Sequence, residues 1–144
     1  MSGPDPFELE RFVSAQSGSY ATALGEIRAG RKRSHWIWFI FPQVRGLGVS
    51  PTSQHYGISG IKEARAYFEH PVLGPRLVQC TEALLALKSR NASAIMPYPD
   101  DLKLRSSMTL FERAAGSGSV FSRVLDEFYE GRRDERTIEL LGGA

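Results

Sequence analysis

The chain has one cysteine, no long apolar run and almost no net charge, and each shortage excludes a class of protein. The single cysteine, Cys80, cannot form an internal disulfide, as is usual for proteins of a reducing cytoplasm. No apolar run approaches the roughly 20 residues that a membrane-spanning helix needs. The first residues also lack the basic start and the apolar stretch of a signal peptide. We therefore expect a cytoplasmic protein with no membrane partner.

Charge and motifs exclude further classes. The net charge is +2, from 18 Lys and Arg against 16 Asp and Glu, and basic and aromatic residues do not alternate in a repeat. A nucleic-acid partner is therefore not expected. His35, His55 and His70 lack the spacing of metal ligands, and one cysteine cannot build a thiolate cluster. The chain also lacks the Gly-rich nucleotide loops and the G-x-S-x-G nucleophile motif, so we predict neither a metal site nor a cofactor.

Helical periodicity, in contrast, is abundant. At 144 residues the chain is long enough to fold as one domain without disulfides or metals. We predict an all-α protein, a compact single-domain bundle of about eight short helices at residues 5–144, after a flexible N-terminus at residues 1–4. The clearest apolar stripe is Leu73, Leu77, Cys80, Leu84 and Leu87. One further helix is expected to begin at Asp5–Pro6, another to run from Asp100 to Gly116, and a short turn to follow Asn91. The remaining expected helices are Tyr20–Ala29, Ile61–Glu69, Val120–Tyr129 and Glu135–Leu141.

The segment Arg31–Gln43, RKRSHWIWFIFPQ, places three cations directly before an apolar run that holds both tryptophans. Aromatic and β-branched residues are typical of a strand, but a lone strand has no partner for its backbone groups. A buried helix that begins at Ser34 as its N-cap and ends before Pro42 is therefore favoured. Its deeply buried residues are expected to be Trp38, Phe39 and Ile40.

The beginning of this predicted helix has two interpretations. Free N–H groups near His35 and Trp36, with Lys32 and its basic neighbours just before them, would attract an anion, phosphate above all. Alternatively, the cations are a solvated approach to a core helix. Trp36 and Trp38 point to different sides of a helix, so one can lie in the core while the other lines a pocket.

A second polar group follows the acidic pair at Asp100. On a helix, Asp100, Lys103, Ser106 and Ser107 share one face, beside an apolar face that begins at Leu104. This stripe can line a pocket. It can equally be a surface Asp–Lys pair, with serines that bond back to carbonyls one turn earlier.

Long stretches of the sequence resemble one family. The motif Lys-x-x-His-Trp-x-Trp-Phe-x-Phe-Pro-Gln, together with HPVLGPRL, DDLKLRSSMTLFERA and the segments near both ends, is similar to the bacterial DUF1810 family, sometimes labelled calpastatin. The resemblance covers roughly residues 5–141. It implies a compact, mainly helical single domain with no established biochemical activity. The calpastatin label does not extend to this chain, which has nothing like a disordered calpain-inhibitor repeat.

Two functional hypotheses remain, and the sequence leaves open whether the protein is an enzyme. The first is a site for a small anionic ligand, phosphate-bearing or ribosyl, that is bound and in one version hydrolysed. The candidate acid–base groups are His35 and Asp100, and the candidate ligand-binding residues are Lys32, Ser34, Trp36, Gln43, Lys103 and Ser107. The second is a module that binds a protein partner through the Gly- and Ser-rich loop Val44–Gly60.

The two hypotheses differ in what they require of the fold. A ligand site requires segments 31–36 and 100–107 to meet in space. We expect His35 or Trp36 to lie within direct or one-water reach of Asp100, Lys103 or Ser107. The contact would be at the rim of a pocket that Gln43 also touches.

Overall fold

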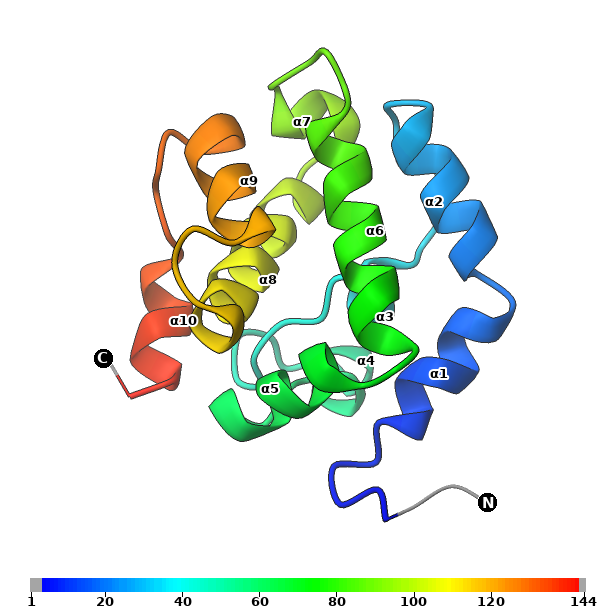
Figure 1. Cartoon of the computed structure of the whole chain (residues 1–144), viewed down its shortest axis with the longest axis vertical. Coiled ribbons are helices and arrows are strands. Elements are labelled where there is room, and N and C mark those ends of the chain that lie inside the picture. The colour runs from blue at the N-terminus through cyan, green and yellow to red at the C-terminus, as the bar shows by residue number, and fades with distance from the viewer. Residues whose placement is uncertain (1–3, 143–144) are drawn as a thin grey trace.

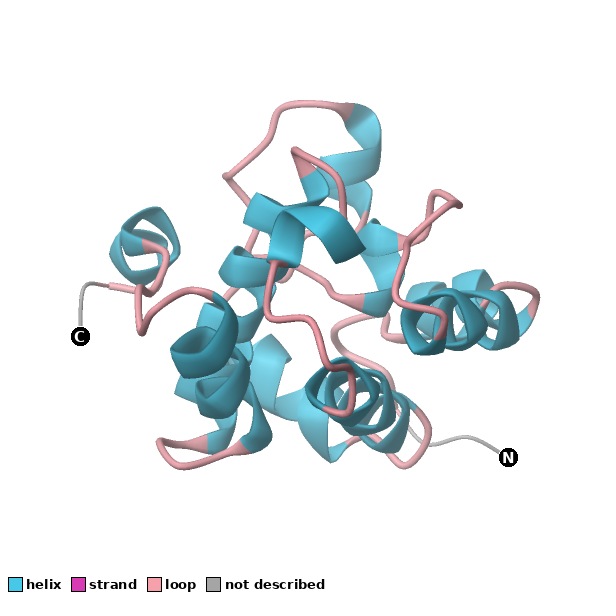
Figure 2. Cartoon of the chain, turned by 90° about the horizontal axis from the view of Figure 1, so that it is seen from above, coloured by secondary structure: helices cyan, strands magenta, loops and turns pink. Residues whose placement is uncertain are grey.

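The computed structural model describes residues 4–142, and this part of the chain consists of helices and loops (Figure 2). The all-α, single-domain prediction is confirmed, with ten helices among these residues instead of about eight. Residues 1–3 of the expected flexible N-terminus, and residues 143 and 144, lie outside the described part. The helices are α1 (Glu10–Ser17), α2 (Tyr20–Arg28), α3 (Ile37–Ile40), α4 (Pro51–His55), α5 (Ile61–Glu69), α6 (Leu73–Leu85), α7 (Ala92–Ile95), α8 (Asp100–Ala115), α9 (Val120–Phe128) and α10 (Glu135–Leu140).

Helices α6 and α8 form the centre of the bundle (Figure 1). Helix α6 packs between α2 on one side and α9 on the other, while α8 contacts α3, α5, α7, α9 and α10. The predicted α6 stripe is confirmed, because Leu77, Cys80 and Leu84 are each no more than 1% exposed. Leu87, just beyond the helix, is half-buried.

The corner between α5 and α6 requires two particular residues. A Cβ atom on Gly74 would lie 2.0 Å from the carbonyl oxygen of Phe68, so a side chain there would push the two helices apart. The His70 Nδ1 accepts hydrogen bonds from the backbone N–H groups of Val72 and Leu73, at 3.1 and 3.2 Å. His70 therefore satisfies helix-start amides that would otherwise have no partner.

The first helix begins later than predicted. Asp5 does not start it. Its carboxylate closes a preceding turn by accepting from the N–H groups of Leu9 and Glu10. Arg11 then ties α1 to the middle of the chain, because its guanidinium donates to the carbonyls of His55 and Gly57 and pairs with buried Glu63 at 2.7 Å.

The loop Val44–Gly60 has more structure than its composition indicated. It contains the short helix α4 and an isolated parallel bridge between Val44 and Ile58. The bridge is held by hydrogen bonds from Arg45 N to Ile58 O and from Ile58 N to Gln43 O. These contacts hold the backbone of Gln43 in place.

The aromatic segment is helical for one turn only, and the prediction of Ser34 as its N-cap is wrong. Trp36 occupies the N-cap position of α3, and its side chain makes no capping hydrogen bond within residues 4–142. Ile40 is buried as expected, but Trp38 and Phe39 are half-buried, and the core position belongs to Trp36. The side-chain amide of Gln16 binds the carbonyl of Phe39 at 2.7 Å, so this end of the turn is satisfied from another helix.

Across residues 4–142, the helices are too short or too polar for any of them to cross a membrane.

Truncation of Leu77 to alanine is expected to lower the free energy of unfolding by about 2–5 kcal/mol, because it leaves a cavity between α6 and its neighbours. Urea unfolding followed by circular dichroism measures the change. The matched control is Val49→Ala at a 90% exposed position, which should change stability by less than about 0.5 kcal/mol. Equal effects of the two substitutions would contradict the buried α6 stripe.

Candidate functional site

Glu26, on α2, organises the basic segment that precedes the aromatic turn. Its carboxylate accepts hydrogen bonds from the N–H groups of Arg33 and Ser34, the hydroxyl of Ser34 and the indole N–H of Trp36, at 2.5–2.9 Å. One of the two interpretations of the sequence placed an external anion in this neighbourhood. An internal carboxylate lies there instead, and it engages the Ser34 hydroxyl that was expected to cap a helix.

Burial alternates along the segment as a result. Lys32 and Trp36 are buried and Ser34 is half-buried, whereas Arg31, Arg33 and His35 are exposed. Two of the three cations are therefore solvated, as the alternative interpretation proposed, and only Lys32 enters the protein. The candidate base His35 lies on the exposed side.

Lys32 joins this segment to the first turn of α8. Its ammonium lies 2.6 Å from the Asp100 carboxylate, and the two side chains are only 6% and 18% exposed. The same ammonium donates to the carbonyl of Ser34 at 2.5 Å and lies 5.0 Å from the centre of the Trp36 ring. Segments 31–36 and 100–107 therefore meet in space through Lys32. Within residues 4–142, no direct hydrogen bond or ion pair joins His35 or Trp36 to Asp100, Lys103 or Ser107.

Lys103 extends the Lys32–Asp100 pair into a cluster of three charged residues. Its ammonium is 3.3 Å from the second oxygen of Asp100 and 4.2 Å from the centre of the Trp38 ring. One carboxylate is thus shared by two ammonium groups, each of which also lies over a tryptophan. Lys32 and Lys103 against Asp100 leave the cluster with a charge of +1.

A groove of about 240 Å³ opens beside Lys103. Trp38 and Gln43 also line a narrower, more enclosed space next to it, toward Tyr56. The tryptophans divide as predicted, one in the core and one at a pocket wall, but Trp36 is the core residue. The groove is lined by Trp38, Gln43, Leu47, Gly48, Pro99, Leu102, Lys103, Ser106 and Asp134.

Asp134 is the groove residue that the sequence analysis missed. It caps α10 by accepting from the N–H and the hydroxyl of Thr137. The same oxygen accepts from the hydroxyl of Ser106 at 3.0 Å, and the other lies 4.0 Å from Arg105. Its position before Glu135–Leu140 is an N-cap signal that the sequence contains. Its approach to Ser106, 28 residues earlier in the chain, has no local signal.

The remaining candidates fall into two groups. Gln43 and Lys103 line the groove, with Asp100 directly behind Lys103. Ser107 is fully buried and does not line it, and its hydroxyl has no hydrogen-bond partner within residues 4–142. In the same part of the chain, no three His, Cys, Asp or Glu side chains gather as metal ligands would.

Comparison with known proteins places the chain in a family. The family described as "Protein of unknown function (DUF1810)" matches residues 6–141. The chain belongs to the DUF1810 family. It is 52% identical to the conserved hypothetical protein Rv1873 from Mycobacterium tuberculosis, whose crystal structure superposes with a TM-score of 0.93 over 95% of this chain and 98% of that one. Among curated proteins, no match was found.

The hydrogen bonds to Glu26 make the stability of this DUF1810 domain depend on pH. Burial alone would raise the pKa of this carboxyl group, but the hydrogen bonds from Ser34, Arg33 and Trp36 outweigh burial and lower the pKa from 4.5 to about 2. Because the folded pKa lies below the ordinary value, the stabilisation is complete above pH 4.5 and is lost as the pH falls toward 2.

Replacement of Glu26 by glutamine is expected to destabilise the fold by roughly 2 kcal/mol at neutral pH, after allowance for solvent screening of a half-buried group. The difference from the wild type should shrink as the pH is lowered from 6 to 3, which urea unfolding at each pH measures. Glu130→Gln, at an 85% exposed carboxylate, is the matched control and should follow the wild type. A Glu26→Gln difference that stays constant with pH would contradict this role.

Proposed function

We propose that the protein binds a small, hydroxyl-bearing anionic ligand, such as a sugar phosphate, in the groove beside Trp38. The carrying observation is the placement of Lys103, whose ammonium lies at the groove between the Asp100 carboxylate and the Trp38 ring. A cation beside an aromatic wall suits a ligand with an anionic group and a ring or sugar face. The cluster's charge of +1 also favours an anion.

The other polar groups of the groove are suited to hydroxyls. Gln43 offers an amide donor and acceptor, and Ser106 and Asp134 offer oxygens already joined by a hydrogen bond. Asp134 would oppose a second negative charge nearby. This combination favours a ligand with a single phosphate and several hydroxyls over one with two phosphates.

The proposal is for binding, and the arrangement of the titratable groups is the reason. Asp100 is held by two lysines behind the groove, and one oxygen of Asp134 is engaged by Ser106 and Thr137. His35 is exposed and does not line the groove. Proton transfer to a ligand needs a titratable group within hydrogen-bond reach of it. Asp134 is the carboxylate that lines the groove, and one of its oxygens is already engaged.

Exposed apolar residues near the groove favour a second candidate, a surface that binds a protein partner. Val49 in the loop before α4 is 90% exposed, and Tyr98 and Leu102 around the start of α8 are 75% and 41% exposed. Single exposed apolar residues are common, so small-molecule binding remains the first proposal.

For the location, we propose the cytoplasm of a bacterium. Cys80 is a free, buried thiol, which suits a reducing compartment. The similar protein Rv1873 comes from Mycobacterium tuberculosis.

Ribose 5-phosphate, with ribose and inorganic phosphate as comparison ligands, tests the proposed site. Titration into ¹⁵N-labelled protein at low salt should shift the Trp38 indole N–H and the Gln43 side-chain amide. Lys103→Ala should weaken binding about tenfold, because it removes a charged contact. Higher salt should weaken binding further.

The matched control is Lys62→Ala, which removes an exposed lysine from α5 and should leave the affinity unchanged. Unmoved Trp38 and Gln43 signals with all three ligands would refute the proposal. The exposed apolar surface would then be the better candidate.

A further inference from the structure

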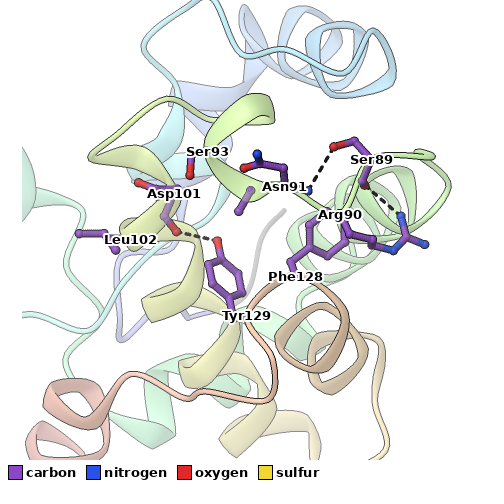
Figure 3. Close-up of a pocket in the computed structure, with 9 residues that line it drawn as sticks. Ser89, Arg90, Asn91, Ser93, Asp101, Leu102, Phe128 and Tyr129 are labelled. Atoms are coloured by element: carbon purple, nitrogen blue, oxygen red, sulfur yellow. Dashed lines mark hydrogen bonds between the residues drawn. The ribbon is translucent and has the colours of Figure 1, made fainter.

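The two walls of the groove beside Lys103 are held in different ways. One wall is the beginning of the long helix α8, which is anchored by the pair of Lys32 with Asp100. From another direction, the hydroxyl of Tyr129 donates to the carbonyl of Asp101 at 2.6 Å (Figure 3). The other wall is Trp38, which lies in the four-residue helix α3. A helix this short is not stable by itself, so contacts from other segments must fix its position.

One such contact precedes Trp38 in the chain and another follows it. Before it, the indole N–H of Trp36 donates to Glu26 on α2 at 2.8 Å. After it, the side-chain amide of Gln16 on α1 donates to the carbonyl of Phe39 at 2.7 Å. Within residues 4–142, no backbone N–H donates to this carbonyl. Gln16 therefore supplies a donor that the backbone does not provide at the end of so short a helix.

The side-chain amide of Gln16 can do this in one orientation only. Gln16 is 1% exposed, and its Oε1 accepts from the guanidinium of Arg76 on α6 at 3.2 Å. A guanidinium only donates and a carbonyl only accepts, so the amide must turn its oxygen to Arg76 and its NH₂ to Phe39. The same NH₂ lies 3.1 Å from the hydroxyl of Tyr67, which is itself 3.5 Å from the Phe39 carbonyl. Gln16 is thus the closer of the two donors to this carbonyl.

From this geometry we infer that Gln16 is a positioning residue of the groove and acts on the ligand through the Phe39 carbonyl and the Trp38 ring. The inference rests on the proposed function, in which the Trp38 ring is the wall that the ligand contacts. Gln16 does not line the groove and touches no ligand there. By holding the carbonyl that follows Trp38, it keeps the ring 4.2 Å from the ammonium of Lys103. A wall fixed in advance lowers the cost of ordering it when the ligand binds.

Replacement of Gln16 by glutamate removes the donor to Phe39 and changes little else. The side chain keeps its size and still accepts from Arg76, but it places an oxygen against the Phe39 carbonyl. In the ligand-free ¹⁵N-labelled protein, the indole N–H signal of Trp38 should move, while that of the buried Trp36 should stay. Ribose 5-phosphate should bind about fivefold more weakly, which is the effect of one weakened contact at an aromatic wall.

Two further variants complete the test. Gln79→Glu makes the same chemical change at an exposed glutamine on α6. It is the matched control and should leave both indole signals and the affinity as in the wild type. Gln16→Met also removes the donor, but it places no charge in the core. It should reproduce the Trp38 shift and the weaker binding even if Gln16→Glu fails to fold.

Failure of this inference can be distinguished from failure of the proposed function. If ribose 5-phosphate does not bind the wild type, the proposed function fails, and the ligand-free indole signals still test the role of Gln16. A folded Gln16 variant with an unmoved Trp38 signal would overturn the inference. A Trp36 shift as large as that of Trp38 would also overturn it, because it would indicate a general loosening of the fold. Undiminished ribose 5-phosphate affinity in a folded Gln16 variant would do the same.

Discussion

The ion pair between Lys32 and Asp100 is the contact on which the arrangement of the groove beside Lys103 depends. It joins a segment near the N-terminus to the first turn of α8, 68 residues later, with both side chains largely removed from water. A buried pair is a weak source of net stability, because desolvation offsets much of the attraction. Its value here is positional: the Ser34 carbonyl and Lys103 satisfy the remaining groups, so the two segments meet in one register.

Glu26 makes that register possible. By accepting from Arg33, Ser34 and Trp36, it holds the chain so that alternate residues face inward and Lys32 is directed toward α8. An internal carboxylate thus satisfies backbone donors that would otherwise attract an external anion. The cation available to the proposed anionic ligand is Lys103, the member of the cluster that lines the groove.

Local patterns predicted the helices well and the aromatic segment poorly. The apolar residues from Leu77 to Leu84 recur at helical spacing, so their burial on one face of a helix could be predicted from that spacing alone. Ser34 is an equally good cap by local rules, but its hydroxyl has a stronger partner in Glu26. The apolar run from Trp36 to Phe41 is too short for periodicity to decide its conformation, and contacts such as Gln16 with Phe39 end the helix after one turn.

The sequence by itself determined the all-α class, the family, the α6 stripe and the polar face that carries Asp100 and Lys103. These depend on residue spacing within one helix or on a long motif, and both can be read without coordinates. Only the tertiary structure decided that Trp36 is the core tryptophan and Trp38 the groove wall, and that Asp134 joins the groove. The physical reason is that each of these depends on a partner from a distant segment, and the stability gained from such contacts, not local preference, selects the conformation.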